Sequence, residues 1–442
     1  MRPGQEDDSG TAPYPGGTYP WLVVAILLII FSVAFLDRVV MSILVVPMQR
    51  DLGINDLQAG ILMGPAFVLS YALAGMAMGY LADHHNRRLL LFGGVALWGT
   101  ATFASGLLEN FSALLVARML VGLGESCIVP ATFSLLADYF PPNRLGRASA
   151  VVTIGNSVGA GGALLGGGAV LAVASTQALV PIDLFSRSAP WQQVLLLFGA
   201  LSLVAALLVM MIREPERRRG DAPVADHPRA GRFLPFALQN RRAILLILAP
   251  YILVALCLNA VSAWIPTVLV RKFALEPGEA AMSFGLITVA VVPFAAIGGG
   301  YAADRLSEMR RGGRYLLIPA LAPFAALGVT LIWLSAEYWL AMTGLVLIMA
   351  VGSGLSNSVF AAITEISPPA VRGRFLGLYA VLASLIPVGL GTTVVPLVND
   401  RIFGEPTMLD ASLALLCVPC ILLALACIPN GRICYERLRS AR

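Results

Sequence analysis

The sequence predicts an all-α membrane protein in which twelve transmembrane helices form two pseudo-symmetric six-helix bundles. Of its 442 residues, 58% are hydrophobic and 12% are charged, and the mean hydropathy is +0.82. In soluble domains about a quarter of the residues are charged. The apolar residues gather in blocks of about 20 or more, the length that a helix needs to cross about 30 Å of hydrocarbon.

Two motifs recur about half a chain apart. Gly79-Tyr-Leu-Ala-Asp83 returns as Gly300-Tyr-Ala-Ala-Asp304, 221 positions later. Pro141-Pro142-x-x-x-Gly146-Arg147 returns as Pro368-Pro369-x-x-x-Gly373-Arg374, 227 positions later. A duplicated membrane unit is the architecture of secondary transporters, whose binding sites lie where the two repeats meet.

The first six blocks predict an N-terminal bundle over residues 21–212. Residues 1–20 are polar, acidic and rich in proline and glycine, which predicts a disordered cytoplasmic tail. The first block is too long for the apolar core of a signal peptide. The spans of this bundle are expected at about 21–46, 57–82, 89–108, 112–138, 148–172 and 191–212.

The longest polar break, residues 213–242, divides six spans from six and predicts a cytoplasmic linker between the bundles. It ends in an amphipathic stretch, Phe233-Leu-Pro-Phe-Ala-Leu238. A C-terminal bundle over 243–430 and a cytoplasmic tail over 431–442 follow. The spans of this bundle are expected at about 243–270, 278–303, 315–335, 338–366, 375–398 and 410–430.

The basic residues predict the orientation. If the N-terminus is cytoplasmic, the cytoplasmic segments hold 23 of the 30 lysines and arginines and the opposite loops hold five. Because cytoplasmic loops carry an excess of lysine and arginine, both termini are expected in the cytoplasm. The basic pI of 9.0 is then a consequence of topology, and no nucleic-acid partner is expected. We predict a multi-pass protein of the cell inner (plasma) membrane.

Four charged residues lie within the predicted spans and away from the span ends: Asp37 and Arg38 in the first, Arg118 and Glu125 in the fourth. Such charges are costly in a bilayer and are paired or face a cavity. Neighbours on a helix point about 100° apart, so Asp37 and Arg38 are expected to have different partners. One interpretation is that Asp37 and Glu125 carry protons during transport. Arg38 and Arg118 would then bind an anionic substrate or couple its binding to the proton sites. The alternatives are a static pair that ties span one to span four, and a permanent Arg118–Glu125 or Arg38–Glu125 salt bridge.

These residues give the chain its resemblance to the major facilitator superfamily. Gly79 to Arg88 resembles the loop after the second span of that superfamily, and Gly300 to Arg305 is a degenerate copy. Arg118-x-x-x-Gly122-x-Gly124-Glu125 resembles its second motif. Phe35-Leu36-Asp37-Arg38 and Arg50-Asp51-Leu52-Gly53 are similar to the Spinster-type branch. The resemblance covers almost the whole chain and implies the major facilitator fold.

The resemblance also implies a conformational latch at the cytoplasmic edge. Its residues are Gly79, Asp83, Arg87 and Arg88, with Asp304 and Arg305 as a weaker second copy that lacks the Arg-Arg spacing. Span five carries Gly155-x-x-x-Gly159 and further glycines to Gly168, which let helices approach closely in a gate. Antiporters of the superfamily carry a proline in this glycine motif, and this span lacks it.

The four charged residues in the middle of spans all belong to the first half of the chain. This distribution predicts a cavity with a charged N-terminal wall and an apolar C-terminal wall. Tyr71, Asn156 and Asn357 are expected to line it. An amphiphilic organic anion or zwitterion fits such a surface, and Spinster-type proteins are associated with lysophospholipids and phosphorylated sphingoid lipids. We therefore predict a proton-coupled secondary transporter with alternating access. The alternatives are a small organic acid or drug transporter, and a non-transporting membrane receptor or scaffold.

No cluster of histidine, cysteine and acidic residues has metal-ligand spacing, and the three histidines, His84, His85 and His227, lie in loops. We therefore expect no metal, no cofactor and no enzymatic activity. The expected partners are protons, a small-molecule or lysolipid substrate and the lipid bilayer. The protein is expected to be a monomer.

Overall fold

The structure, a computed structural model, describes residues 14–15, 17–176, 187–217, 230–308, 313–367 and 372–440. Twelve helical segments in this part of the chain are long and apolar enough to cross a membrane. Each coincides with one of the predicted spans, so the all-α fold with twelve spans is confirmed. The described residues contain no strand.

Three spans of the N-terminal half are broken into two or more helices. Span two breaks at Gly64-Pro65, and Pro65 occupies the first position of α3, where its missing N–H leaves no helical hydrogen bond unmade. Span four breaks directly after Glu125, and span five contains a π-helix in its glycine-rich region. The helices are α1 (Tyr19–Leu52), α2 (Asp56–Met63), α3 (Pro65–His84), α4 (Arg87–Ser105), α5 (Phe111–Glu125), α6 (Ile128–Tyr139), α7 (Pro142–Gly161), the π-helix η1 (Gly162–Gly166), α8 (Gly167–Ala174) and α10 (Pro190–Val209).

The C-terminal half begins with α11, the amphipathic segment predicted at the end of the linker. Its Phe236 ring lies 6.5 Å from the ring of Phe375. The elements of this half are α11 (Ala230–Gln239), α12 (Arg241–Phe273), α13 (Pro277–Ser307), the 3-10 turn η3 (Gly313–Leu316), α14 (Leu317–Leu334), α15 (Tyr338–Ile366), α16 (Arg372–Val398), the π-helix η4 (Asn399–Phe403), the 3-10 turn η5 (Pro406–Met408) and α17 (Leu409–Ser440).

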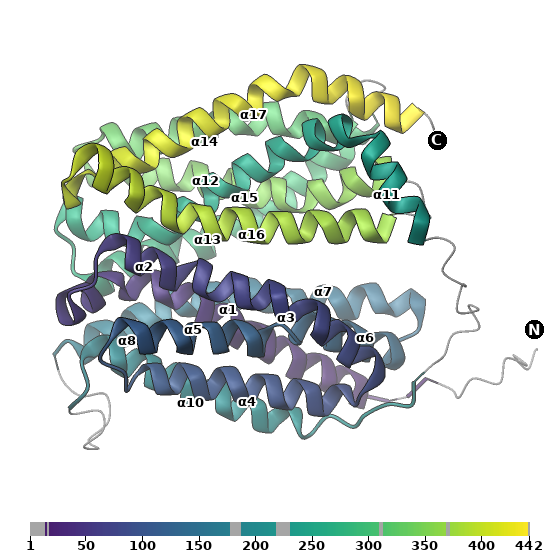
Figure 1. Cartoon of the computed structure of the whole chain (residues 1–442), viewed down its shortest axis with the longest axis horizontal. Helices are drawn as coiled ribbons and strands as arrows, with labels where there is room; N and C mark the ends of the chain where they lie inside the picture. The colour runs from purple at the N-terminus through teal and green to yellow at the C-terminus, as the bar shows by residue number, and fades with distance from the viewer. Residues whose placement is uncertain are drawn as a thin grey trace, which may run out of the picture.

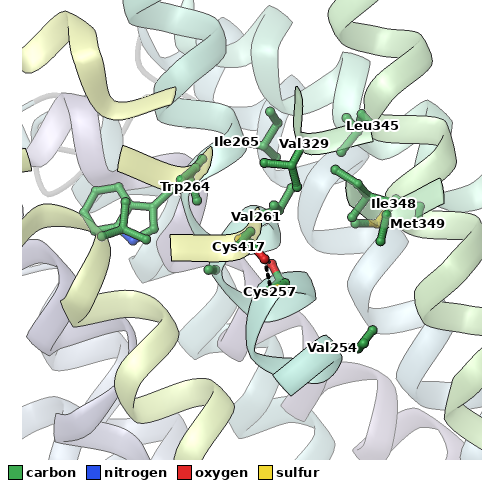
Figure 2. Close-up of a cluster of buried hydrophobic side chains, with 14 of the residues drawn as sticks. Val254, Cys257, Val261, Trp264, Ile265, Val329, Leu345, Ile348, Met349 and Cys417 are labelled. Atoms are coloured by element: carbon green, nitrogen blue, oxygen red, sulfur yellow. Dashed lines mark hydrogen bonds between the residues drawn. The ribbon is translucent and has the colours of Figure 1, made fainter. Parts of the chain in front are cut away.

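The two halves form two layers of helices that run along the same direction, and the two ends of the chain lie at the same end of the molecule (Figure 1). We call this end, with the turn at residues 85–86, the terminal face, and the other end, with the turn at residues 53–55, the opposite face. One cluster of buried apolar residues lies within the N-terminal half, and a second cluster includes residues of both halves. In the C-terminal half, Cys257 of α12 faces Cys417 of α17 among aliphatic side chains (Figure 2), with its Sγ 3.5 Å from the Cys417 carbonyl.

Both predicted tails are shorter than expected. Helix α1 begins at Tyr19, whose hydroxyl donates to the carbonyl of Met211 at 3.0 Å and accepts from the backbone of Arg213 at 2.7 Å. Helix α17 continues to Ser440, because Tyr435 is fully buried and donates to Glu365 at 2.6 Å. Residues 1–13 and 441–442 of the tails, and 218–229 of the linker, lie outside the described residues.

Candidate functional site

The two halves meet near the opposite face along small residues. A side-chain carbon added at Gly60 or Gly64 would overlap Thr392 of α16. On the other side of the molecule, a carbon added at Gly168 of α8 would lie 2.8 Å from the Ala281 side chain of α13. Contacts this close require glycine, as in other closely packed helices.

Towards the terminal face the same helices separate. A carbon added at Gly75 or Gly79 of α3, or at Gly298 or Gly300 of α13, would meet no neighbouring atom within 4 Å. The interface between the halves is therefore closed at the opposite face and parted towards the terminal face.

Gly64→Val is expected to disfavour this arrangement, because the new side chain overlaps Thr392 and the Val388 carbonyl. Overpacking costs about 1–3 kcal/mol, which changes a two-state equilibrium about 5- to 150-fold. Spin labels at the exposed residues Glu109 and Glu405 of the opposite face should show a longer distance. Gly75→Val is the matched control, and equal distances in the two variants would contradict the prediction.

A cavity of about 910 Å³ lies between the halves, beyond the closed contact. Helices α1, α3, α5 and α7 line it from the N-terminal half, and α12, α13, α15 and α16 from the C-terminal half. The cavity is therefore formed jointly by the two halves.

Asp37 and Arg118 form a buried ion pair at the N-terminal wall. Arg118 Nη1 donates to Asp37 Oδ2 at 3.1 Å, and Thr102 of α4 donates to Asp37 Oδ1 at 2.7 Å. The Nε of Arg118 also donates to the carbonyl of Leu62 at 3.4 Å. The two charged side chains are 3% and 1% exposed. Since both carboxylate oxygens have partners, this pair is a satisfied junction of α1, α4 and α5.

Arg38 and Glu125 form a second pair with unused hydrogen-bonding capacity. The Nε of Arg38 donates to Glu125 Oε2 at 2.6 Å, while Oε1 of Glu125 is buried and has no hydrogen-bond partner. Glu125 is fully buried, whereas 28% of the Arg38 side chain is exposed. Asp37 and Arg38 thus have different partners, as the helical geometry predicted. The structure therefore contains two ion pairs between spans one and four, Asp37–Arg118 and Arg38–Glu125.

Three aromatic rings surround the guanidinium of Arg38. Its Cζ lies 5.2, 4.8 and 5.0 Å from the ring centroids of Phe35, Phe67 and Tyr71. Cation–π attraction at such distances holds the cation in place. Among the described residues, Glu125 is the carboxylate paired with Arg38, and the Arg38 side chain is still 28% exposed where it lines the cavity.

The C-terminal wall is uncharged, as predicted, but it is not wholly apolar. Asn259, Ser262, Thr288, Ser384 and Thr392 line it together with aliphatic and aromatic residues. The hydroxyls of Thr288 and Thr392 donate to carbonyls of their own helices at 2.9 and 3.0 Å, as threonine hydroxyls within helices often do. The C-terminal wall thus combines the predicted apolar residues with uncharged polar ones.

Two of the three polar residues predicted for the cavity line it. Tyr71 and Asn156 contribute to the N-terminal wall. Asn357 belongs to α15, and its side chain lies outside the described residues.

A polar clamp joins the halves at the opposite face. Arg271 of α12 donates to both oxygens of Asp56 at 2.6 and 2.8 Å and to Gln49 Oε1 at 2.8 Å. Gln49 in turn donates to Asp56 at 2.6 Å. The neighbouring Lys272 instead pairs within its own half, with Asp410 at 2.6 Å. Sequence analysis assigned Arg271 no role, because its partners are more than 200 positions away.

The predicted latch residues of the first copy lie at the terminal face. Arg87 is 1% exposed and pairs with Asp138 and with Glu214, the latter at 2.6 Å. Arg88 donates to the Met210 carbonyl at 2.9 Å. These contacts all stay inside the N-terminal half, while Asp83 is exposed.

The second copy of this network is more complete than the sequence indicated. Asp304 accepts from Arg314 at 2.9 Å, and Arg314 also lies 3.6 Å from Glu365. Arg305 is exposed. Arg314 and Glu365 stand 227 positions after Arg87 and Asp138, the same offset as between the two Pro-Pro motifs. Arg314 therefore takes the place of Arg87, and the apparent loss of the arginine reflects an insertion after Asp304.

Comparisons with known proteins agree with this architecture. The family model described as Major Facilitator Superfamily matches residues 26–392. An MFS-type efflux pump of Mycolicibacterium smegmatis is 27% identical over 399 residues, 89% of each chain. Protein spinster homolog 1 of Homo sapiens is 28% identical over 286 residues, 60% of this chain and 51% of that protein. The chain thus matches about half the length of this Spinster relative.

Solved structures share the fold. A bacterial homolog of the human lysosomal transporter Spinster, in an inward-facing and unoccupied conformation, superposes with a TM-score of 0.78 at 21% identity, covering 96% of this chain and 98% of that one. A D-xylose–proton symporter superposes with a TM-score of 0.70 at 13% identity, covering 92% and 97%. The chain belongs to the Major Facilitator Superfamily of membrane transporters, and it is similar to the Spinster-type proteins of that superfamily.

Proposed function

We propose that this transporter is proton-coupled and works by alternating access between two rocking halves. The observation that carries the proposal is the Arg38–Glu125 pair, whose carboxylate is buried and half-satisfied while its arginine reaches the cavity. Burial disfavours a charged carboxyl and a nearby arginine favours it, so a change in the position of Arg38 loads or unloads a proton on Glu125. The complete partner set of Asp37 supports a positioning role for it beside Arg118.

The proposed substrate is an amphiphilic organic anion or zwitterion such as a lysolipid. Arg38 and Arg118 line the cavity, whereas their carboxylate partners lie behind them, so the wall presents positive charge. Aliphatic and aromatic residues, among them Phe284, Val289 and Met349, provide room for an acyl chain. Tyr71 and Asn156 are proposed to contact the polar group.

The proposed orientation places both termini in the cytoplasm of a cell whose inner membrane holds the protein as a monomer. The terminal face is then cytoplasmic, and the arrangement described above is inward-open. In the outward-open state, the loops with Gly79, Asp83, Arg87 and Arg88 and with Asp304 and Arg305 are proposed to meet and close the terminal face.

Reconstituted protein should move labelled lysolipid in response to a pH gradient. Glu125→Gln is expected to reduce gradient-driven flux to the level of protein-free vesicles, and Asp37→Asn to reduce it strongly. Glu436→Gln removes a carboxylate from an exposed pair with Arg432 and is the matched control. Unchanged flux in Glu125→Gln would remove the proton site from the proposal.

A second candidate is the efflux of drug-like molecules. It is favoured by the M. smegmatis relative, which is named an efflux pump and matches 89% of this chain. The hydroxyls and the Asn259 amide on the C-terminal wall also suit compact polar ligands. A thermal-shift screen of lysolipids, organic acids and drugs separates the two candidates, because the true substrate class should raise the melting temperature.

A further inference from the structure

We propose that binding of a monoanionic substrate takes up one proton at this site, so that the anion and the proton are carried together. The inference rests on the proposed function and assigns it a direction of coupling. A monoanion is a symport substrate of this chain, and a zwitterion binds without a proton.

The charges of the site are balanced before any ligand binds. Two arginines and two carboxylates form two ion pairs, and the C-terminal wall of the cavity adds no charged residue. A bound anion therefore adds an uncompensated charge to a buried region. Such a charge is strongly disfavoured unless another group neutralises it.

Arg38 is the cation that a bound anion would pair with. It is the more exposed of the two arginines, at 28% against 3%, and the rings of Phe35, Phe67 and Tyr71 surround its guanidinium. Arginine binds carboxylates and phosphates through its paired N–H donors. The anion and Glu125 thus compete for the same cation.

Glu125 is the carboxylate that can take up a proton when Arg38 pairs with the anion. Its Oε1 has no partner and its Oε2 depends on Arg38, whereas both oxygens of Asp37 are held by Arg118 and Thr102. When an anion draws the charge of Arg38, a proton from solution binds the Glu125 carboxylate and restores neutrality. The titratable or charged groups near Glu125 are Asp37 and Arg38 of α1, Tyr71 of α3, Arg118 of α5 and Cys127 between α5 and α6.

Linkage makes the effect reciprocal: if anion binding favours the proton, protonation must favour the anion by the same factor. An inwardly directed proton gradient then drives the anion into the cell, whichever way the chain is oriented. This outcome is opposite to proton-driven efflux. It also agrees with the absence of the antiporter proline from the glycine-rich sequence of span five.

Proton uptake on binding tests the inference directly. Purified wild-type protein in weak buffer with a pH-indicator dye is titrated with lysophosphatidylglycerol, which carries one net negative charge, and with lysophosphatidylcholine of equal chain length, which carries none. We expect one proton taken up per bound anion and none per bound zwitterion. Equal proton uptake for the two lipids, proton release, or no uptake with the bound anion would each overturn the inference.

Two further measurements make the result independent of one variant. In the wild type, the affinity for the anion should fall about tenfold per pH unit above the titration of Glu125, while the affinity for the zwitterion stays constant. Glu125→Gln should bind the anion at all pH values without proton uptake, and Glu436→Gln should behave like the wild type. If the anionic lipid neither binds nor moves, the substrate class of the proposed function fails too; binding without proton uptake refutes the coupling alone.

Discussion

Replacing Asp37 by alanine is expected to destabilise the protein by about 3–5 kcal/mol, because it leaves a buried arginine without its counter-charge. Arg118 is 3% exposed and donates to Asp37, so the substitution leaves a largely buried charge without its counter-ion. Thr102 loses its acceptor as well. Thermal unfolding of the purified variant, followed by tryptophan fluorescence, should show a melting temperature far below that of the wild type.

The double variant Asp37→Leu/Arg118→Met should recover most of this stability, since replacing a buried ion pair by apolar residues is often nearly neutral. Glu436→Gln, which breaks a pair in which both side chains are more than a third exposed, should change stability by less than about 1 kcal/mol. If Asp37→Ala melts at the same temperature as Glu436→Gln, the buried pair is not a structural junction.

Arg271→Gln is expected to open the opposite face. The substitution removes both hydrogen bonds from Arg271 to Asp56, which link α12 to α2. An ion pair that forms only when this face is closed shifts the equilibrium between the closed and open states by about 1–3 kcal/mol. The distance between labels at Glu109 and Glu405 should lengthen. The distance between labels at the exposed residues His84 and Glu308 of the terminal face should shorten in the same sample.

Lys272→Gln is the matched control, because Lys272 pairs with Asp410 and caps the last carbonyls of α14 inside its own half. It should lower the melting temperature without altering either distance. Equal distance distributions in Arg271→Gln and the wild type would show that the clamp does not hold the opposite face closed.

The helices of this chain could be predicted because each membrane span appears in the sequence as a continuous run of apolar residues. A bilayer demands about 20 consecutive apolar residues, and the polar breaks between such blocks are short. The helix ends were harder to predict. Helix α17 extends ten residues past its predicted end, because Tyr435 is buried and donates a hydrogen bond to Glu365 of α15, a contact that the local sequence does not indicate.

The sequence predicted which residues form the candidate site, but it did not predict which of them pair with each other. Charges inside an apolar span are conspicuous, so Asp37, Arg38, Arg118 and Glu125 could be found from the sequence. Which carboxylate faces which arginine depends on the rotation of α1 against α5. Thr102 has no such signature, because a lone threonine in an apolar span most often bonds to its own helix.

The sequence by itself determined the duplicated twelve-span fold, the family and the charged N-terminal half, because hydropathy, repeat offset and motif spacing are properties of neighbouring residues. Only the tertiary structure decided that Asp37 is fully satisfied while Glu125 is not, that Arg271 clamps the opposite face, and that Arg314 replaces Arg87 in the second copy. These facts depend on contacts between helices that lie tens to hundreds of residues apart. Their geometry is set by how whole helices pack, and no local pattern encodes it.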